Sequence, residues 1–180
     1  MSSSPSDKKP SSPEGRGLLE KIRLMSIDVD GVLTDGSIYY ADDGNTFRKF
    51  NAKDGMGLVY LRKAGIKVTI ISSGNGGAIE HRARRLGIEH VFTDVFDKVE
   101  TLKVVTQGLG LSLNQVAHMG DDINDLPVFE VIGCAIAPAD AVPEVLANAD
   151  LVTGNPGGQG AVREICDILC GQAAKRERQA

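Results

Sequence analysis

Asp28 and Asp30 stand two residues apart at the end of an apolar run, MSIDVDG at residues 25–31. Side chains two residues apart on a strand share one face, so the two carboxylates would lie side by side if the strand continued. Gly31 indicates instead that the chain turns here. Two anions at the end of a buried strand cost free energy unless a cation lies between them. The pair therefore points to a cation site where chemistry can take place.

Three more chemically capable groups follow predicted strands. Ser72 closes an apolar run, Lys98 opens a predicted helix, and the sequence GDDIND at residues 120–125 follows a further strand. Taken singly, each has an ordinary explanation as a helix cap, a surface charge or an acidic helix start. The carboxyl ends of parallel strands, however, share one edge of a sheet, which is where such folds bind ligands. We therefore expect these groups to form one site with the two aspartates.

This set of side chains suits phosphoryl transfer through a covalent intermediate. Asp28 is a carboxylate nucleophile that can form an aspartyl-phosphate. Asp30 can protonate the leaving oxygen and later deprotonate the attacking water. Mg²⁺ prefers hard oxygen ligands, which Asp28 and Asp121 would supply. Ser72 offers a neutral donor to a phosphoryl oxygen and Lys98 a fixed positive charge, so the pattern predicts a magnesium-dependent phosphoryl-transfer site.

Apolar strands that alternate with helical patterns must position these groups. Strands are predicted at residues 23–29, 66–71, 90–92 and 116–119, with weaker candidates at 133–136 and 150–152. Helices are predicted at residues 55–64, 77–86, 98–109, 125–131, 142–147 and 161–169. Such alternation is typical of a parallel sheet covered on both faces. The predicted fold class is α/β, a doubly wound and mainly parallel sheet.

Residues 37–50 break this alternation and predict a β-hairpin with an Asp-Gly turn. Four of the eight aromatic residues of the chain fall in this hairpin, on both of its faces: Tyr39, Tyr40, Phe47 and Phe50. A lone hairpin cannot bury two apolar faces by itself. We therefore expect it to pack against other subunits, which would make the protein an oligomer.

The composition is that of an ordinary globular protein. Of 180 residues, 42% are hydrophobic and 24% charged, and the net charge of −4 gives no reason to expect nucleic acid or an anionic membrane as a partner. Three cysteines lack the number and spacing of a disulfide framework or zinc site. The chain has neither a bilayer-spanning apolar run nor a signal peptide, so a cytoplasmic location is expected.

A single domain is expected at residues 18–173. It would follow a leader at residues 1–17, which is rich in Ser, Pro and Lys and is predicted to be disordered. A polar tail is expected at residues 174–180.

The motifs DxDG, Ser/Thr, Lys and GDDxxD occur here in the order found in haloacid-dehalogenase-like phosphohydrolases, which the sequence resembles. Four longer stretches resemble, more narrowly, the 3-deoxy-D-manno-octulosonate 8-phosphate phosphatases. These are DVDGVLTDG at 28–36, KDGMG at 53–57, GDDINDLP at 120–127 and PGGQGAVREIC at 156–166. The similarity covers residues 24–169, nearly all of the predicted folded part.

The resemblance implies a magnesium-dependent sugar-acid phosphatase of lipopolysaccharide precursor synthesis that has no large cap domain. It also implies a homotetramer in which hairpins 37–50 pack together and one subunit helps to close its neighbour's site, with residues 157–163 near that neighbouring site. Asp30 would bind the metal through its backbone carbonyl. The match to GDDxxD gives Asp122 and Asp125 supporting roles.

The chain departs from the family pattern at two positions. Gly74 and Gln159 stand where the family often has arginine, so two expected partners of a substrate carboxylate are missing. A phosphatase of a nonulosonate 9-phosphate, or of another sugar phosphate, is therefore an alternative. A receiver-like or catalytically inactive regulatory module is an alternative from another class. A receiver would lack the GDDxxD motif, and the intact chemical motifs argue against an inactive module.

Three further residues lie beside these motifs. His118 precedes the GDDIND loop within its strand, where packing is the expected role and a buried position supporting the site residues is the alternative. Asp54 adjoins a glycine and is expected to form a turn. The resemblance leaves open that Lys53 and Asp54 face the substrate.

Overall fold

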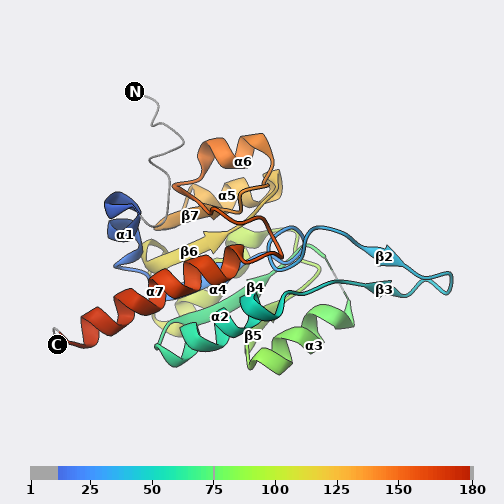
Figure 1. Cartoon of the computed structure of the whole chain (residues 1–180), viewed down its shortest axis with the longest axis horizontal. Coiled ribbons are helices and arrows are strands. Elements are labelled where there is room, and N and C mark those ends of the chain that lie inside the picture. Colours follow the sequence, from blue (N-terminus) through green and yellow to red (C-terminus); the bar gives the residue numbers. More distant parts are fainter. Residues whose placement is uncertain (1–11, 75, 179–180) are drawn as a thin grey trace.

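The computed structural model describes residues 12–74 and 76–178, and its centre is a six-stranded parallel sheet in the order β5-β4-β1-β6-β7-β8 (Figure 1). The strands are β1 Leu24–Ile27, β4 Lys67–Ile71, β5 His90–Phe92, β6 Val116–Met119, β7 Cys134–Ala137 and β8 Leu151–Val152. All five strand pairings are parallel. The predicted fold class is therefore confirmed.

Strand β1 occupies the middle of the sheet, where it pairs with β4 on one side and β6 on the other. Ile27 at its end lies between Ile70 and Met119. All four residues of β1 are buried, as expected for a strand covered on both faces. The chain runs from β1 outward to β4 and β5 and then returns to β6 on the other side of β1. Ligands bind at such a switch point beyond the carboxyl ends of the strands, which is where Asp28 follows β1.

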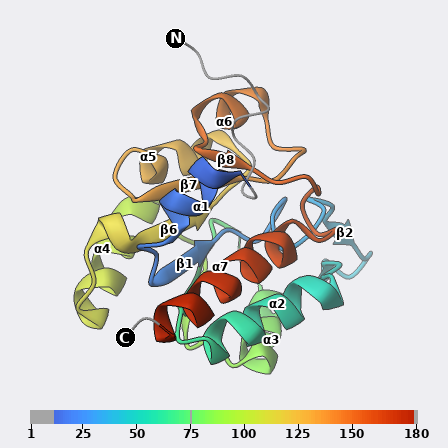
Figure 2. The same ribbon diagram turned by 60° about the vertical axis from the view of Figure 1, so that its left-hand side comes forward.

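Helices cover both faces of the sheet (Figure 2). They are α1 Pro13–Leu19, α2 Ala52–Lys63, α3 Gly77–Leu86, α4 Lys98–Leu109, α5 Leu126–Phe129, α6 Pro143–Asn148 and α7 Ala161–Glu177, with 3₁₀ turns at Leu113–Gln115 and Ile123–Asp125. Alternate residues of β1 supply the two sides. Ile27 packs in the core beneath α2, α3 and α7, whereas Leu24 packs with Leu102 of α4.

The predicted hairpin is present as a separate two-stranded unit, β2 Tyr39–Tyr40 paired antiparallel with β3 Thr46–Phe47. It projects away from the parallel sheet (Figure 1). Its turn contains Gly44 with φ of +84°, as an Asp-Gly turn requires. Tyr40 is 75% and Phe47 59% exposed. Both predicted apolar faces thus remain open to solvent in the single chain.

The ends of several elements differ from the predictions. The helix predicted at 125–131 is reduced to α5 after a 3₁₀ turn, and α7 continues eight residues beyond Leu169 and into the predicted polar tail. Part of the predicted leader forms α1, because Ser12 caps its first turn and Leu19 is buried. Residues 1–11 of the leader lie outside the described residues. No helix in the described ranges is long and apolar enough to cross a membrane.

Candidate active site

The loop that follows β1 folds tightly back on itself. The carbonyl of Val29 accepts hydrogen bonds from the next backbone turn, including one of 2.9 Å from the N–H of Leu33. Gly31 has φ of +86°, in the left-handed region. A Cβ atom at Gly31 would lie 1.9 Å from Oδ2 of Asp121. Glycine is therefore required both for the turn and for the close approach of Asp121.

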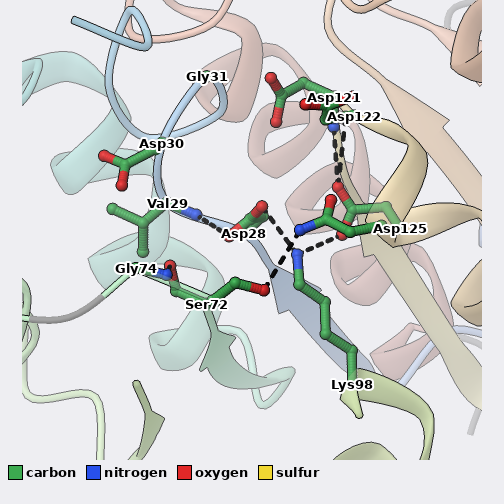
Figure 3. Close-up of polar contacts among 12 residues, drawn as sticks. Asp28, Val29, Asp30, Gly31, Ser72, Gly74, Lys98, Asp121, Asp122 and Asp125 are labelled. Atoms are coloured by element: carbon green, nitrogen blue, oxygen red, sulfur yellow. Dashed lines mark hydrogen bonds and ion pairs between the residues drawn. The ribbon is translucent and has the colours of Figure 1, made fainter. Parts of the chain in front are cut away.

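A buried ion-pair network joins three of the predicted residues (Figure 3). Nζ of Lys98, the first residue of α4, donates to Oδ2 of Asp28 at 2.8 Å and to Oδ1 of Asp125 at 2.6 Å. Burial acts to lower the pKa of Lys98, but the charges of Asp28 and Asp125 outweigh it and the pKa is raised. Burial and the carboxylate of Asp125 raise the pKa of Asp28, which Lys98 opposes. Lys98 is thus held as the cation between two anions.

Asp125 also binds groups other than Lys98. Its Oδ1 also lies 2.9 Å from Nε2 of His118, and its Oδ2 accepts the backbone N–H of Asp121 at 3.1 Å. Nδ1 of His118 lies 2.9 Å from the hydroxyl of Ser26 in β1. Although burial acts to raise the pKa of Asp125, the hydrogen bond and charge of His118, together with Lys98, lower it to about 2. His118 is therefore part of the polar network, beyond the packing role expected for it.

Asp121 completes a set of three carboxylates that could bind a cation. Oxygens of Asp28, Asp121 and Asp125 lie within 4.8 Å of one another. Oδ1 of Asp121 is buried and has no hydrogen-bond partner in the described part of the chain. Burial, followed by the charges of Asp28 and Asp125, raises the pKa of Asp121 to about 7. An orphaned carboxylate oxygen among other carboxylates fits a divalent cation with oxygen ligands.

Ser72 follows β4 at the same edge of the sheet and is buried. Its hydroxyl oxygen accepts the N–H of Gly74 at 3.2 Å, which leaves the hydroxyl hydrogen available to another acceptor. Its backbone N–H donates to the carbonyl of Phe92, the last residue of β5, at 2.9 Å, and its carbonyl accepts the N–H of Val95 at 3.1 Å. Ser72 and Asp30 lie on one side of Asp28 in Figure 3, and Asp121 and Asp125 lie on the other.

Asp30 is held by a residue that the sequence did not single out. Nε of Arg48, which follows β3 of the hairpin, donates to Oδ1 of Asp30 at 2.8 Å, and Nη2 donates to Oδ2 at 3.0 Å. The hydrogen bond to Asp30 raises the pKa of Arg48 above its ordinary value. The side chain of Arg48 is only 4% exposed. The carboxylate of Asp30 therefore points toward the hairpin and not toward the oxygens of Asp121.

The structure brings most predicted site residues together. Five of them converge on one buried cluster or its edge: Asp28, Ser72, Lys98, Asp121 and Asp125. Asp122 is exposed and caps a 3₁₀ turn by accepting the N–H of Ile123 at 2.7 Å. Arg48 was missed, since its role depends on how the hairpin returns to the site and no local pattern signals it. His118 was noticed in the sequence, but its bond to Asp125 was not foreseen.

The glycine-rich loop before α7 supports the site from within the same chain. A Cβ atom at Gly157 would lie 1.8 Å from the carbonyl oxygen of Gly31, so the two loops are in direct backbone contact. Asp54 is buried and accepts the backbone N–H groups of Gly160 at 3.2 Å and Arg163 at 2.8 Å. Asp54 thus caps the first turn of α7, which is a different role from the turn expected for it.

Comparison with known families and proteins agrees with this arrangement. The family of haloacid dehalogenase-like hydrolases matches residues 82–165. The 3-deoxy-D-manno-octulosonate 8-phosphate phosphatase of Salmonella typhimurium strain LT2 is 40% identical over 160 residues, which cover 89% of this chain and 85% of that protein. The enzyme of the same name from Escherichia coli K12 is 41% identical over 150 residues, covering 83% and 80% of the two chains.

Solved structures of similarly named proteins share the fold. The phosphatase from Yersinia pestis superposes with a TM-score of 0.88 at 38% identity, covering 92% of this chain and 89% of that one. The phosphatase from Moraxella catarrhalis, solved with magnesium ion, phosphate ion and KDO, gives 0.86 at 33% identity, covering 91% and 94%. On this sequence and structural similarity, the chain belongs to the 3-deoxy-D-manno-octulosonate 8-phosphate phosphatases, within the haloacid dehalogenase-like hydrolases.

Proposed function

We propose that this phosphatase hydrolyses 3-deoxy-D-manno-octulosonate 8-phosphate to the free sugar acid (KDO) and inorganic phosphate, with Mg²⁺, in lipopolysaccharide precursor synthesis. The observation that carries the proposal is the place of Asp28. Its carboxylate follows the central strand, accepts a hydrogen bond from Lys98 at 2.8 Å, and has an oxygen within 4.8 Å of a carboxylate oxygen of Asp121. The names of the relatives, and the magnesium, phosphate and KDO in one solved relative, support the substrate and the metal.

In the first half-reaction, a carboxylate oxygen of Asp28 attacks the phosphorus atom. The new O–P bond forms as the bond between phosphorus and the sugar oxygen breaks, and Asp30 gives its proton to that sugar oxygen. The hydroxyl of Ser72 donates to one phosphoryl oxygen. Lys98 holds negative charge that develops on the phosphoryl group.

In the second half-reaction, Asp30 takes a proton from water as the water oxygen attacks the phosphorus atom of the aspartyl-phosphate. The bond to Asp28 breaks, which regenerates the carboxylate and releases phosphate. The side chains of Asp28 and Asp121 and the backbone carbonyl of Asp30 would hold Mg²⁺. When bound, Mg²⁺ supplies positive charge that screens the nucleophile from the negative phosphate.

Release of phosphate from the sugar-acid phosphate, measured with Mg²⁺ before and after Asp28→Asn, tests this function. We expect turnover in the wild-type chain and a loss of at least about a thousandfold in the variant, because the amide cannot form the aspartyl-phosphate. An aryl phosphate assayed in parallel detects phosphatase activity whatever the sugar specificity. A wild-type chain that cleaves neither compound would favour the inactive regulatory module.

A nonulosonate 9-phosphate is the second candidate substrate, and one observation favours keeping it. Gly74 and Gln159 replace two arginines that the family often has, so recognition of the sugar must differ in detail. A panel of sugar-acid 8- and 9-phosphates and neutral sugar phosphates separates the candidates through their kcat/KM values. The compound with the highest value identifies the substrate class.

We also propose that the protein works in the cytoplasm as a homotetramer joined through hairpin 37–50. The exposed aromatic side chains Tyr39, Tyr40 and Phe47 support an interface there, because they form two apolar faces on one small unit.

A further inference from the structure

Among the described residues, Arg48 uses only one edge of its guanidinium group. Nε and Nη2 form the two bonds to Asp30, at 2.8 and 3.0 Å. The remaining nitrogen, Nη1, is buried and has no hydrogen-bond partner among the described residues. A buried N–H without an acceptor destabilises the folded state, more so on a charged group, so native proteins rarely contain one. The free edge of Arg48 therefore calls for an acceptor from outside the described residues, which a bound ligand can supply.

The space around Arg48 depends on the glycine at position 74. A Cβ atom on Gly74 would lie 2.7 Å from Oδ2 of Asp30 and 3.2 Å from Nη2 of Arg48. A Cβ atom on Gly76 would lie 3.5 Å from Nη1. A long side chain at position 74 would therefore collide with Asp30 and Arg48 in their present positions. The arginine that relatives often have at position 74 is absent here, and the guanidinium of Arg48, from the hairpin, lies close to Gly74 instead.

Three other cations of this region, Arg82, Lys49 and Lys98, are already engaged. Nη2 of Arg82 donates to the carbonyl of Asn51 at 3.0 Å, and Lys49 is paired with Asp35. Lys98 is bound between its two carboxylates at the phosphate end. A sugar-acid phosphate brings a second anion, its carboxylate, on the side of the leaving group. A planar guanidinium edge matches a carboxylate better than an ammonium does.

We propose that Arg48 determines specificity for a sugar acid: its Nη1 edge binds the substrate carboxylate while its Nε and Nη2 atoms keep Asp30 in place. This inference rests on the proposed function and assigns the recognition residue that the sequence lacks at Gly74. One side chain from the hairpin thereby contacts both the proton-transfer group and the anion that distinguishes the substrate from a neutral sugar phosphate.

The test measures competitive inhibition of aryl phosphate hydrolysis by the free sugar acid, KDO, and separately by inorganic phosphate. Inhibition by KDO reports carboxylate binding without any dependence on proton transfer by Asp30. For Arg48→Met we expect the inhibition constant of KDO to rise about 10- to 100-fold, the effect of losing a charge-assisted contact. We expect the inhibition constant of inorganic phosphate to change less than about threefold.

Two further variants sharpen the result. Arg48→Lys can keep a single contact to Asp30 but has no second edge, so its inhibition constant for KDO should also rise at least about fivefold. Lys49→Met removes a neighbouring cation of the same hairpin whose side chain is 61% exposed, and should leave both inhibition constants unchanged. Circular dichroism and thermal unfolding confirm that each variant is folded.

Equal rises in the inhibition constants of KDO and inorganic phosphate in Arg48→Met would overturn the inference, because they would show that Arg48 has only a structural role. Wild-type affinity for KDO in both Arg48 variants would overturn it as well. Failure of the proposed function has a different signature. The wild-type chain would then hydrolyse the aryl phosphate without hydrolysing any sugar-acid phosphate.

Discussion

Lys98 neutralises two buried carboxylates, and its removal would leave Asp28 and Asp125 without their common cation. Removing one member of a buried ion pair costs about 3–5 kcal/mol. We therefore expect Lys98→Ala to lower the free energy of unfolding by about this amount and to abolish turnover. Urea unfolding in the absence of Mg²⁺ measures the loss. Lys103→Ala on the same helix is the matched control, because its side chain is 51% exposed and should matter by less than about 0.5 kcal/mol.

An unchanged urea midpoint in Lys98→Ala would show that the two carboxylates do not need the lysine in the folded state. Restored stability on addition of Mg²⁺ would instead agree with the proposed site, because the metal supplies replacement charge near Asp28.

As the proposed metal ligand, Asp121 would link metal binding to pH. Its pKa is raised from 3.8 to about 7 by burial, Asp28 and Asp125, so the metal-free folded chain keeps a proton that the unfolded chain loses. Stability from this group is present below about pH 4 and is lost as pH rises toward 7. Mg²⁺ requires the ionised carboxylate. The rise in melting temperature on adding Mg²⁺ should therefore be larger at pH 7.5 than at pH 5.5.

Thermal unfolding with Mg²⁺ or a chelator at these two pH values measures the effect. Asp121→Asn is the control, since an amide does not titrate and is a weaker ligand. We expect it to be more stable than the wild-type chain in chelator at pH 7.5 and to gain little from Mg²⁺. A Mg²⁺-induced shift that is equal at both pH values in the wild-type chain would contradict the role given to Asp121.

The loop before α7 supports the nucleophile loop through backbone contact, and Gly157 is the point of contact. In Gly157→Ala the new Cβ atom would lie 1.8 Å from the carbonyl oxygen of Gly31, which is backbone and cannot swing away. The two loops must separate, so we expect kcat to fall at least tenfold and the melting temperature to fall by several degrees. Steady-state kinetics and thermal unfolding of the purified variant measure both effects.

Gly154→Ala is the matched control for that substitution. It lies three residues earlier in the same segment, and the nearest atoms to its Cβ would be the carboxylate oxygens of Glu164, at 3.7 and 3.9 Å. We expect kcat and melting temperature to stay near the wild-type values. Similar losses in both variants would mean that general loosening of the loop, and not the contact with Gly31, is responsible.

Local sequence patterns explain why most strands and helices, and most residues of the site, could be predicted from the sequence. Asp28, Ser72 and Lys98 each adjoin an apolar strand or open a helix, and parallel strands bring such positions to one edge of a sheet. The pair of Arg48 and Asp30 could not be predicted in this way, because its members are 18 positions apart in the chain with a whole hairpin between them. Asp54 bonds a helix turn more than a hundred residues away, which no short-range pattern reveals.

The predicted end of α7 is wrong for a related reason. The apolar pattern of α7 is interrupted at Gly171 and Gln172, yet the helix continues to Glu177, and Ala173 beyond the interruption is buried in the core. Tertiary packing extends this helix beyond the point that intrinsic propensity favours.

At the scale of the whole molecule, the hairpin exposes large aromatic side chains to solvent. Tyr40 and Phe47 expose 75% and 59% of their surface, and Arg48 at the base of the same hairpin reaches the active site. Burial of such side chains between subunits would contribute about 1.5–3 kcal/mol each. If the proposed assembly through the hairpin is right, the wild-type chain should sediment as a tetramer at micromolar concentration. The double variant Tyr40→Ser, Phe47→Ser should sediment as smaller species with unchanged far-ultraviolet circular dichroism.

The same double variant should also bind KDO more weakly, because a hairpin without its neighbours holds Arg48 less firmly against Asp30. Analytical ultracentrifugation and the inhibition constant of KDO test the two effects on one preparation. Val104→Ser is the control, since Val104 is 64% exposed on α4, away from the hairpin, and its loss should alter neither result. A wild-type chain that sediments as a monomer would contradict the interface, and a dissociated variant with wild-type KDO affinity would separate assembly from recognition.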